Sequence, residues 1–381
     1  MTARDLVRYE YSTDWRNVIY DGLIKIKTKD MRLIPLPPNS VQKRLIEMIW
    51  GIEQSGKPVR IMIPKARQHG ISTITEAIIY AKTAFQPNVN AIIVADKGEH
   101  AANIFEMSQL MHNEMIADLR PVTARRNAYE LAFSENHSKI EIGTTGRSGT
   151  YHIFHSSETA YYQDAENTML GVLQTVPNLP GTMVVMESTG NGIGNYFYQR
   201  CMDAEAGKSD YTLFFIPWFE NEEYRISAPQ QFTPQSSGHF GDEKYYQETF
   251  NLTNDQLLWR RYAIANLCGG DIQKFQQEYP ATLDECFQGT GYPVFSHEIL
   301  NQMATEAKPP TATGIIEGNE IVLSEDDRGW LKVWQYPCED AWHHRYCISA
   351  DTGGTWEGAD YDSAYVRDRV TGETVAAIHG H

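Results

Sequence analysis

Residues 65–73, "KARQHGIST", follow the apolar run "VRIMI" and combine a glycine with two cations and two hydroxyls. A strand that ends in a glycine-containing turn and opens into a helix directs backbone N–H groups and the positive helix end at an anion. In the usual phosphate-binding loop, G-x-x-x-x-G-K-[ST], the lysine directly precedes the hydroxyl residue, whereas Ile71 occupies that position here. The stretch is therefore either a basic surface turn or a phosphate loop whose lysine, Lys65, stands at its front.

In a nucleotide-binding loop of this kind, Gly70 and Ile71 lie in the turn that presents backbone N–H groups to the phosphates. Ser72 or Thr73 would supply the hydroxyl that holds Mg²⁺. Lys65 would fold back over the β- and γ-phosphates, with the next cation, two residues on, beside it.

Two later stretches supply the remaining chemistry. "YHIFHSSETAYY" places Glu158 after an apolar strand, where a carboxylate can orient an attacking water, although this stretch by itself favours an exposed loop acid. Its neighbour Ser157 stands where an aspartate would normally help to hold Mg²⁺. "MVVMESTGNG" ends another strand, and its Gly-Asn-Gly is also a good turn. Four residues there could sense a γ-phosphate: Ser188, Thr189, Gly190 and Asn191.

Composition bounds the class of protein. The 381 residues are 41% hydrophobic, which predicts a folded chain of two domains. No apolar run approaches the ~18–20 residues of a membrane span, and the amino terminus lacks a signal-peptide core, so we expect a cytoplasmic protein without a membrane partner. The five cysteines are scattered singly, which indicates neither a disulfide framework nor a cysteine zinc site.

The net charge of −16 excludes a protein that coats nucleic acid with its whole surface. Residues 1–70 nevertheless hold 13 Lys or Arg against 7 Asp or Glu, a local charge of +6, so a local basic face stays open.

Four segments follow from the patterns along the chain. Residues 1–36 are expected to form an arm or edge element. Residues 37–220 alternate apolar strands with helices, beginning with a helix capped by Asn39 or Ser40, and this alternation indicates a mostly parallel sheet covered on both faces. Residues 221–310 indicate a helical linker region, and short strands return over 311–381.

The order and spacing of these motifs resemble the large terminase subunit of tailed bacteriophages, the motor that drives DNA into a capsid and cuts it. Several of these ATPases have a loop written K-x-R-Q-x-G-x-[ST], with the lysine at its front, as in residues 65–73. "GTTGRSGTYHIFHSSETAYY" resembles their Walker B region, "ESTGNG" resembles the motif that couples hydrolysis to movement, and "WRRYAIANLCGGDIQKFQQEYPATLDECFQGTGYPVF" resembles their linker.

The resemblance implies a P-loop NTPase-type α/β sheet, a helical linker and the start of an RNase H-like nuclease. It implies an ATP and Mg²⁺ site in which Glu158 is catalytic and Ser72 and Ser157 lie at the metal. Eight residues are expected at the nucleotide, the first as the adenine-sensing glutamine: Gln42, Lys65, Arg67, Gln68, Gly70, Ile71, Ser72 and Thr73. The transition-state arginine would be Arg67, Arg147, Arg60 or one from a neighbouring subunit.

The last segment, "YCISADTGGTWEGADYDSAYVRDRVTGETVAAIHG", predicts three strands, the first ending in Asp351. In the resemblance, Asp351 is a catalytic metal ligand of the nuclease for Mg²⁺ or Mn²⁺, whereas Asp360 and Asp362 are turn acids. A two-metal site needs several carboxylates. In the family the others come from later elements, so DNA cleavage is expected only in a longer chain, and 311–381 is expected to be a partial nuclease domain.

The implied partners are double-stranded DNA, a portal protein, a small terminase subunit and further copies of the chain in a pentameric ring. The implied location is the host cytoplasm, at the portal vertex of the procapsid. Two alternatives stay open: a helicase-like DNA-dependent ATPase, and a non-hydrolysing capsid-assembly or DNA-binding scaffold. Ile71 and Ser157 are the substitutions that favour the scaffold.

Overall fold

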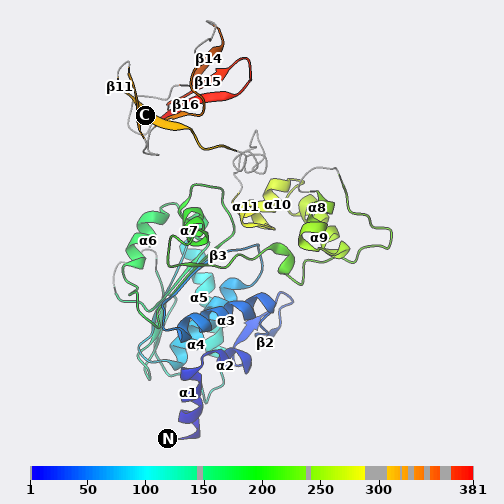
Figure 1. Ribbon diagram of the computed structural model, residues 1–381. Helices are drawn as coiled ribbons and strands as arrows, with labels where there is room; N and C mark the ends of the chain where they lie inside the picture. Colours follow the sequence, from blue (N-terminus) through cyan, green and yellow to red (C-terminus); the bar gives the residue numbers. More distant parts are fainter. Residues whose placement is uncertain are drawn as a thin grey trace. The chain divides into compact units, whose positions relative to one another are not determined.

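The computed structural model describes residues 2–143, 149–236, 242–287, 307–317, 320–324, 330–338, 344–351 and 362–380. The chain divides into two compact units, Met1–Tyr292 and Pro293–His381, shown in Figure 1. The first unit contains the expected phosphate loop.

An eight-stranded sheet organises the first unit, in the order β10-β3-β9-β8-β4-β7-β6-β5. The six strands from β10 to β7 pair in parallel, and β6 and β5 add an antiparallel edge. This arrangement confirms the predicted mostly parallel sheet. The strands are β10 (Thr212–Leu213), β3 (Val59–Pro64), β9 (Met183–Ser188), β8 (Ile153–Ser157), β4 (Asn90–Ala95), β7 (Lys139–Ile142), β6 (Glu130–Phe133) and β5 (Thr123–Arg126).

Helices cover both faces of this sheet, because successive side chains of each strand point to opposite faces. Ile61 and Ile63 of β3 pack into a core with α3 (Ser40–Gln54), α4 (Ile71–Phe85) and α5 (Gly98–Glu114). Met62 of the same strand packs into a second core with α6 (Ala165–Leu173) and α7 (Tyr196–Glu205). Ile61 and every second residue of β3 counted from it therefore lie on the face of the sheet that α4 covers.

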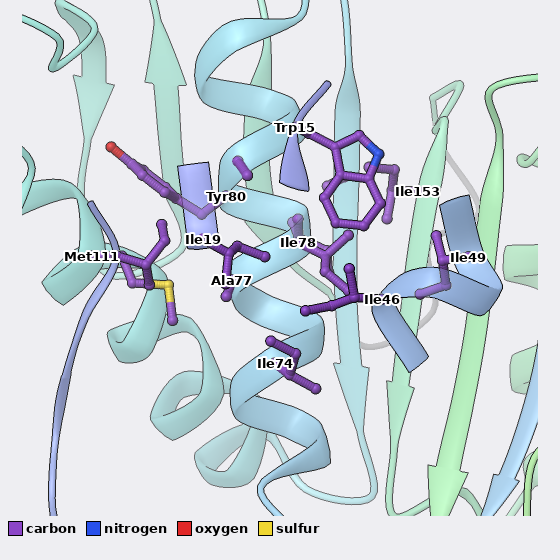
Figure 2. Close-up of a cluster of buried hydrophobic side chains, with 14 of the residues drawn as sticks. Trp15, Ile19, Ile46, Ile49, Ile74, Ala77, Ile78, Tyr80, Met111 and Ile153 are labelled. Carbon is purple, nitrogen blue, oxygen red and sulfur yellow. The ribbon is translucent and has the colours of Figure 1, made fainter. Parts of the chain in front are cut away.

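The first 36 residues form α1 (Ala3–Thr13), α2 (Arg16–Tyr20) and the hairpin of β1 (Lys25–Lys27) and β2 (Leu33–Pro35). They are packed on α4 rather than extended as an arm, and Figure 2 shows Trp15 and Ile19 against Ala77 and Ile78. The reason is a helical spacing of apolar residues that the sequence prediction did not use. The buried residues of this segment include Tyr11, Trp15, Val18 and Ile19.

The predicted linker region contains four helices in its described part: α8 (Glu243–Phe250), α9 (Asn254–Asn266), α10 (Ile272–Glu278) and α11 (Leu283–Cys286). Helices α8, α9 and α10 surround an aromatic core in which the rings of Tyr224 and Trp259 stack with centroids 4.0 Å apart, whereas Cys286 of α11 belongs to the second core of the sheet. Ala66 of the phosphate loop belongs to the same core, so this helical region packs directly against the loop. Within the described residues, no helix is both long and apolar enough to cross a membrane.

The second unit contains an antiparallel sheet in the order β12-β11-β13-β16-β15-β14. The three predicted carboxyl-terminal strands are present as neighbours, in agreement with the expected start of an RNase H-like fold. The strands are β11 (Ala312–Glu317), β12 (Glu320–Ser324), β13 (Leu331–Val333), β14 (Tyr346–Asp351), β15 (Asp362–Asp368) and β16 (Thr374–Gly380).

Candidate nucleotide site

The expected phosphate loop joins the carboxyl end of β3 to the start of α4. Gly70 caps the helix in the left-handed region, with φ of +68°, which favours glycine. A Cβ at this position would lie 2.6 Å from Nε2 of Gln42, so a larger residue would also have to displace the end of that side chain. Because the first N–H groups of a helix have no partner within it, the loop directs donors at the space before α4.

Gln42 holds this loop in place. Its Nε2 donates to the Gly70 carbonyl at 2.8 Å, and its Oε1 accepts from the backbone N–H of Asn39 at 3.0 Å. Asn39, rather than Ser40, is the cap of α3, and its Oδ1 accepts from the Gln42 N–H at 2.9 Å. The structure thus assigns Gln42 a structural task beneath the loop, and adenine recognition stays a prediction.

Lys65 lies at the front of the loop and is buried. Its Nζ is 3.0 Å from Oε2 of Glu187 and 3.5 Å from Oε1 of Glu158. Burial by itself would lower the pKa of Lys65, but the two carboxylates outweigh it and raise that pKa above its usual value. The side chain therefore carries a fixed positive charge beside the amino end of α4.

Glu158 lies where the sequence predicted, directly after β8. Its backbone is left-handed, with φ of +53°, and turns the chain sharply at the sheet edge. Its Oε2 accepts a 3.4 Å hydrogen bond from the hydroxyl of Ser188, at the end of β9. The predicted phosphate cation, the predicted water-orienting acid and the start of the coupling segment are thus brought together at the carboxyl ends of β3, β8 and β9.

Glu187 is the residue of this site that sequence reasoning missed. It is fully buried in β9, and its Oε1 accepts hydrogen bonds from Ser72 Oγ at 2.7 Å and Ser157 Oγ at 2.6 Å. Burial opposes its ionisation, yet Lys65 and His155 together with Ser157 lower the pKa of Glu187 below its usual range. The sequence offered one signal for its position. Side chains alternate between the faces of a strand, and Glu187 comes two residues after a core residue on the face toward α4.

A second buried acid extends this network beneath the loop. Nδ1 of His155 lies 2.8 Å from Oε1 of Glu76, whose other oxygen accepts from Ser108 at 2.6 Å. Burial opposes protonation of the ring, but the carboxylates of Glu187, 3.6 Å from Nε2, and Glu76 raise the pKa of His155 to about 9. The two glutamates therefore flank an imidazolium, and the interior of the site is a balanced set of charges.

The positions of the Ile71 and Thr73 side chains account for the differences between this loop and the usual sequence pattern. The Ile71 side chain is 1% exposed and belongs to the core on α4, so this position has no room for a charged lysine. Only its backbone is available to a ligand. The Thr73 hydroxyl points at Met107 of α5, 3.9 Å from Sδ, so Ser72 is the loop hydroxyl that faces Glu187.

The predicted arginines lie in different places. Arg67 Nε donates to the carboxylate of Glu278, at the end of α10, and its side chain is half exposed. Gln68 accepts a 3.1 Å hydrogen bond from Lys29 at the outer rim of the loop. Arg60 is buried near the amino end of β3, where it donates to backbone carbonyls, and is therefore remote from the loop. Arg147 lies outside the described residues.

The coupling segment after β9 is held from two sides. Tyr161 OH donates to the Gly190 carbonyl at 3.0 Å and lies 3.1 Å from Thr189 Oγ1, while Asn191 Nδ2 donates to the Ala160 carbonyl at 3.0 Å. From the helical region, Gln277 Nε2 donates to the same Gly190 carbonyl at 3.0 Å.

The phosphate loop is bound to the same end of α10. The backbone N–H of Arg67 donates to the Glu278 carbonyl at 3.1 Å, next to the residue that holds Gly190. Two consecutive residues of α10, Gln277 and Glu278, therefore contact the coupling segment and the phosphate loop.

Asp351 is the last residue of β14 in the second unit, is exposed, and is a register partner of Ser363. Asp362 begins β15 on the neighbouring strand, while Asp360 lies outside the described residues. Among the residues that the structure describes, no group of three or more His, Cys, Asp or Glu is arranged to hold a metal.

No protein-family model matches the chain, and no curated protein matches its sequence. Among solved structures, the large terminase of bacteriophage HK97 matches 92% of this chain and 64% of its own, with 12% identity and a TM-score of 0.49. The large terminase of a thermophilic bacteriophage matches 87% of this chain and 65% of its own, with 10% identity and a TM-score of 0.44. The chain is similar to phage large terminases.

The ATPase domain of the Thermus phage P74-26 large terminase also matches, over 65% of this chain and 98% of its own, with 15% identity and a TM-score of 0.39. These structures come from the family that the sequence motifs resemble. The chain spans 64% of the HK97 protein and 65% of the thermophilic bacteriophage protein, and structures of the latter contain ADP or ATP-gamma-S.

Proposed function

We propose that this chain is the ATP-hydrolysing subunit of a motor that packages viral double-stranded DNA. The observation that carries the proposal is the meeting of Lys65, Glu158 and Ser188 beside the amino end of α4. A buried cation, a carboxylate at a strand end and helix N–H groups are the parts that phosphoryl transfer to water needs.

Lys65 and the N–H groups of the loop would bind the β- and γ-phosphates. Lys65 then exchanges a carboxylate partner for phosphate oxygens. Glu158, which is partly exposed, would orient the water that attacks the γ-phosphate and accept its proton. Arg67 would stabilise the transferring phosphoryl group once it leaves Glu278, and Gln68 would contribute at the rim of the same loop.

The donors in the site fit Mg²⁺, which prefers oxygen ligands. Ser72 and Ser157 supply hydroxyls on either side of one carboxylate oxygen of Glu187. When bound, Mg²⁺ would neutralise charge on the phosphates. Ser72 would hold it directly, and Ser157 would contribute from the Walker B strand.

The segment from Ser188 to Asn191 would pass the change at the γ-phosphate to the helical region. Support comes from Ser188, which contacts Glu158, and Gly190, which contacts Gln277. DNA would be held mainly through its phosphates, so binding would be independent of sequence and sensitive to salt. A portal protein, a small terminase subunit and a pentameric ring at the portal vertex complete the proposal, with Asp351 as one ligand of an associated nuclease site.

DNA-stimulated ATP hydrolysis at low salt tests the proposal, with nucleotide binding measured in parallel. Glu158→Gln should keep ATP binding and lose about 10²–10⁴-fold in turnover, whereas Lys65→Ala should lose both. Glu166→Gln on α6 and Lys57→Ala, both at exposed positions, are matched controls that should behave as the parent.

Each alternative has its own outcome. ATP binding without turnover at any DNA concentration would favour the scaffold. Stimulation by single-stranded but not double-stranded DNA would favour a helicase-like ATPase. Unchanged turnover in Glu158→Gln would show that the water is oriented elsewhere.

A further inference from the structure

We propose that Glu187 supplies the carboxylate of the magnesium site that position 157 lacks. This inference rests on the nucleotide site proposed above and names a residue that the motif resemblance did not assign. It begins from the sheet: β9 lies between the phosphate-loop strand β3 and the Walker B strand β8. A side chain of β9 at the height of Ser157 therefore lies nearer to the loop than Ser157 itself.

Glu187 has this position. It is the register partner of Ser157 on β8 and of Ile63 on β3. One oxygen of its carboxylate accepts from both Ser72 and Ser157. The loop hydroxyl that faces the phosphates and the Walker B position thus converge on one acid, which comes from the strand between them.

The second oxygen of Glu187 supplies the stronger argument. It is fully buried, has no hydrogen-bond partner and is balanced by Lys65, whose Nζ lies 3.0 Å away. If Lys65 turns to the phosphates of ATP, Glu187 loses its nearest positive charge. Its other oxygen keeps the hydroxyls of Ser72 and Ser157, with His155 3.6 Å away, but removing one partner of a buried ion pair has a large energetic cost. A cation that arrives with the nucleotide removes that cost, and Mg²⁺ arrives with ATP.

The competing role for Glu187 is to anchor Lys65 and nothing more. The two roles differ in what a neutral side chain would change. An anchor affects nucleotide binding equally with and without metal, whereas a metal ligand affects only the part of the affinity that the metal provides.

The test is calorimetric titration of ADP into the parent chain and into Glu187→Gln, in Mg²⁺ and in EDTA. A second readout is the affinity of the ADP-saturated protein for Mn²⁺, followed by electron paramagnetic resonance. We expect Glu187→Gln to weaken Mn²⁺ binding about 10–100-fold, in the range found for groups that support a metal, and to abolish the gain in ADP affinity that Mg²⁺ gives the parent. ADP affinity in EDTA should change little.

Glu53→Gln is the matched control, because Glu53 forms a largely buried ion pair with Lys82 of α4, away from the loop. Since Glu187→Gln leaves Lys65 and His155 without their shared partner, Glu187→Asp provides a variant that keeps the charge and withdraws the oxygens by one methylene. It should lose Mn²⁺ affinity in the same direction, and Ser157→Asp in the Glu187→Gln background should restore Mn²⁺ binding.

The outcomes separate this inference from the proposed function. Equal loss of ADP affinity in Mg²⁺ and EDTA, or parental Mn²⁺ affinity in both Glu187→Asp and Glu187→Gln, would overturn the metal role while the nucleotide site stands. If the parent binds ADP in neither condition, the proposed function itself fails.

Discussion

Ser157 and Glu187 are register partners on adjacent parallel strands, and the serine hydroxyl donates a 2.6 Å hydrogen bond to the glutamate. The sequence suggested a degenerate site because of two substitutions, Ile71 and Ser157. The positions of nearby charged side chains weaken that interpretation. Ile71 stands where the usual loop lysine would be, but Lys65, at the front of the loop, places its ammonium 3.0 Å from the carboxylate of Glu187. Ser157 replaces the usual acid, but a carboxylate lies one strand away at the same height.

Moving the lysine back to its usual position should fail. Ile71→Lys would place an ammonium in the core on α4, where a charge without a partner costs several kcal/mol. We expect a large fall in the urea midpoint, and no recovery of nucleotide binding when Ile71→Lys is combined with Lys65→Ala. Ile71→Leu should cost less than about 1.5 kcal/mol. Recovery of binding in the double variant would show that both positions reach the phosphates.

Gly190 should tolerate no side chain. A Cβ there would lie 1.5 Å from the carbonyl oxygen of Cys286 in α11, so Gly190→Ala must displace the helical region. We expect a loss of about 1–3 kcal/mol or more in the free energy of unfolding, together with a loss of DNA stimulation of the ATPase. Gly51→Ala in α3 is the control, because its Cβ meets nothing within 4 Å and alanine favours the helix by about 1 kcal/mol. Parental stability in Gly190→Ala would contradict this packing.

The ion pair between Arg67 and Glu278 should compete with nucleotide. Partly exposed pairs of this kind contribute about 0.2–1 kcal/mol, so Glu278→Gln should raise the affinity for a non-hydrolysable ATP analogue by a factor of about 1.5–5 by freeing the guanidinium. Isothermal titration would measure this factor. In an Arg67→Ala background the same substitution should have no effect, and a similar gain there would mean that Glu278 acts on the nucleotide by another route.

His112 should make the fold sensitive to acid. It lies in α5 with Nδ1 3.2 Å from the Tyr80 hydroxyl, and burial, with Arg126 and Arg120, lowers the pKa of His112 from 6.5 to about 4. The unfolded chain then binds a proton at a higher pH than the folded chain. The stability provided by the neutral ring is therefore present above pH 6.5 and lost as the pH falls from 6.5 toward 4.

Urea unfolding at several pH values measures this loss, with His112→Gln as the comparison. Over that range the free energy of unfolding of the parent should fall by about 1–3 kcal/mol more than that of the variant. Parallel curves for the two proteins would show that folding does not lower the pKa of His112.

Much of the fold could be predicted because its pattern is local. Apolar strands alternating with helices gave the parallel sheet, and the change of composition after residue 220 gave the helical region. The amino-terminal segment was predicted as an arm or edge element, and the pattern did not indicate its two helices on α4. Its apolar spacing from Tyr11 to Ile19 is helical, but α1 also exposes Leu6 and Tyr9, which blurs the pattern, and α2 is only five residues long.

The candidate site could be predicted only in part, for a related reason. Lys65, Glu158 and Ser188 each follow an apolar strand, so the rule that parallel strands end at one edge is enough to bring them together. Glu187 requires the order of the strands, because its contacts depend on β9 lying between β3 and β8. Gln277 contacts a residue 87 positions away in the sequence, and Glu278 contacts one 211 positions away. A local sequence pattern cannot predict contacts across such separations.

Gln277 and Glu278 are neighbours in the chain, so their Cα atoms are held about 3.8 Å apart. The side chain of Gln277 donates a hydrogen bond to the Gly190 carbonyl, and the carbonyl of Glu278 accepts one from the Arg67 N–H. When the coupling segment and the phosphate loop move together, α10 can follow with both contacts intact. When one segment moves alone by more than a hydrogen bond can lengthen, α10 must tilt or lose one of its two hydrogen bonds. The end of α10 therefore fixes the separation of the coupling segment and the phosphate loop: a shared displacement keeps both hydrogen bonds, and a change in that separation strains one of them.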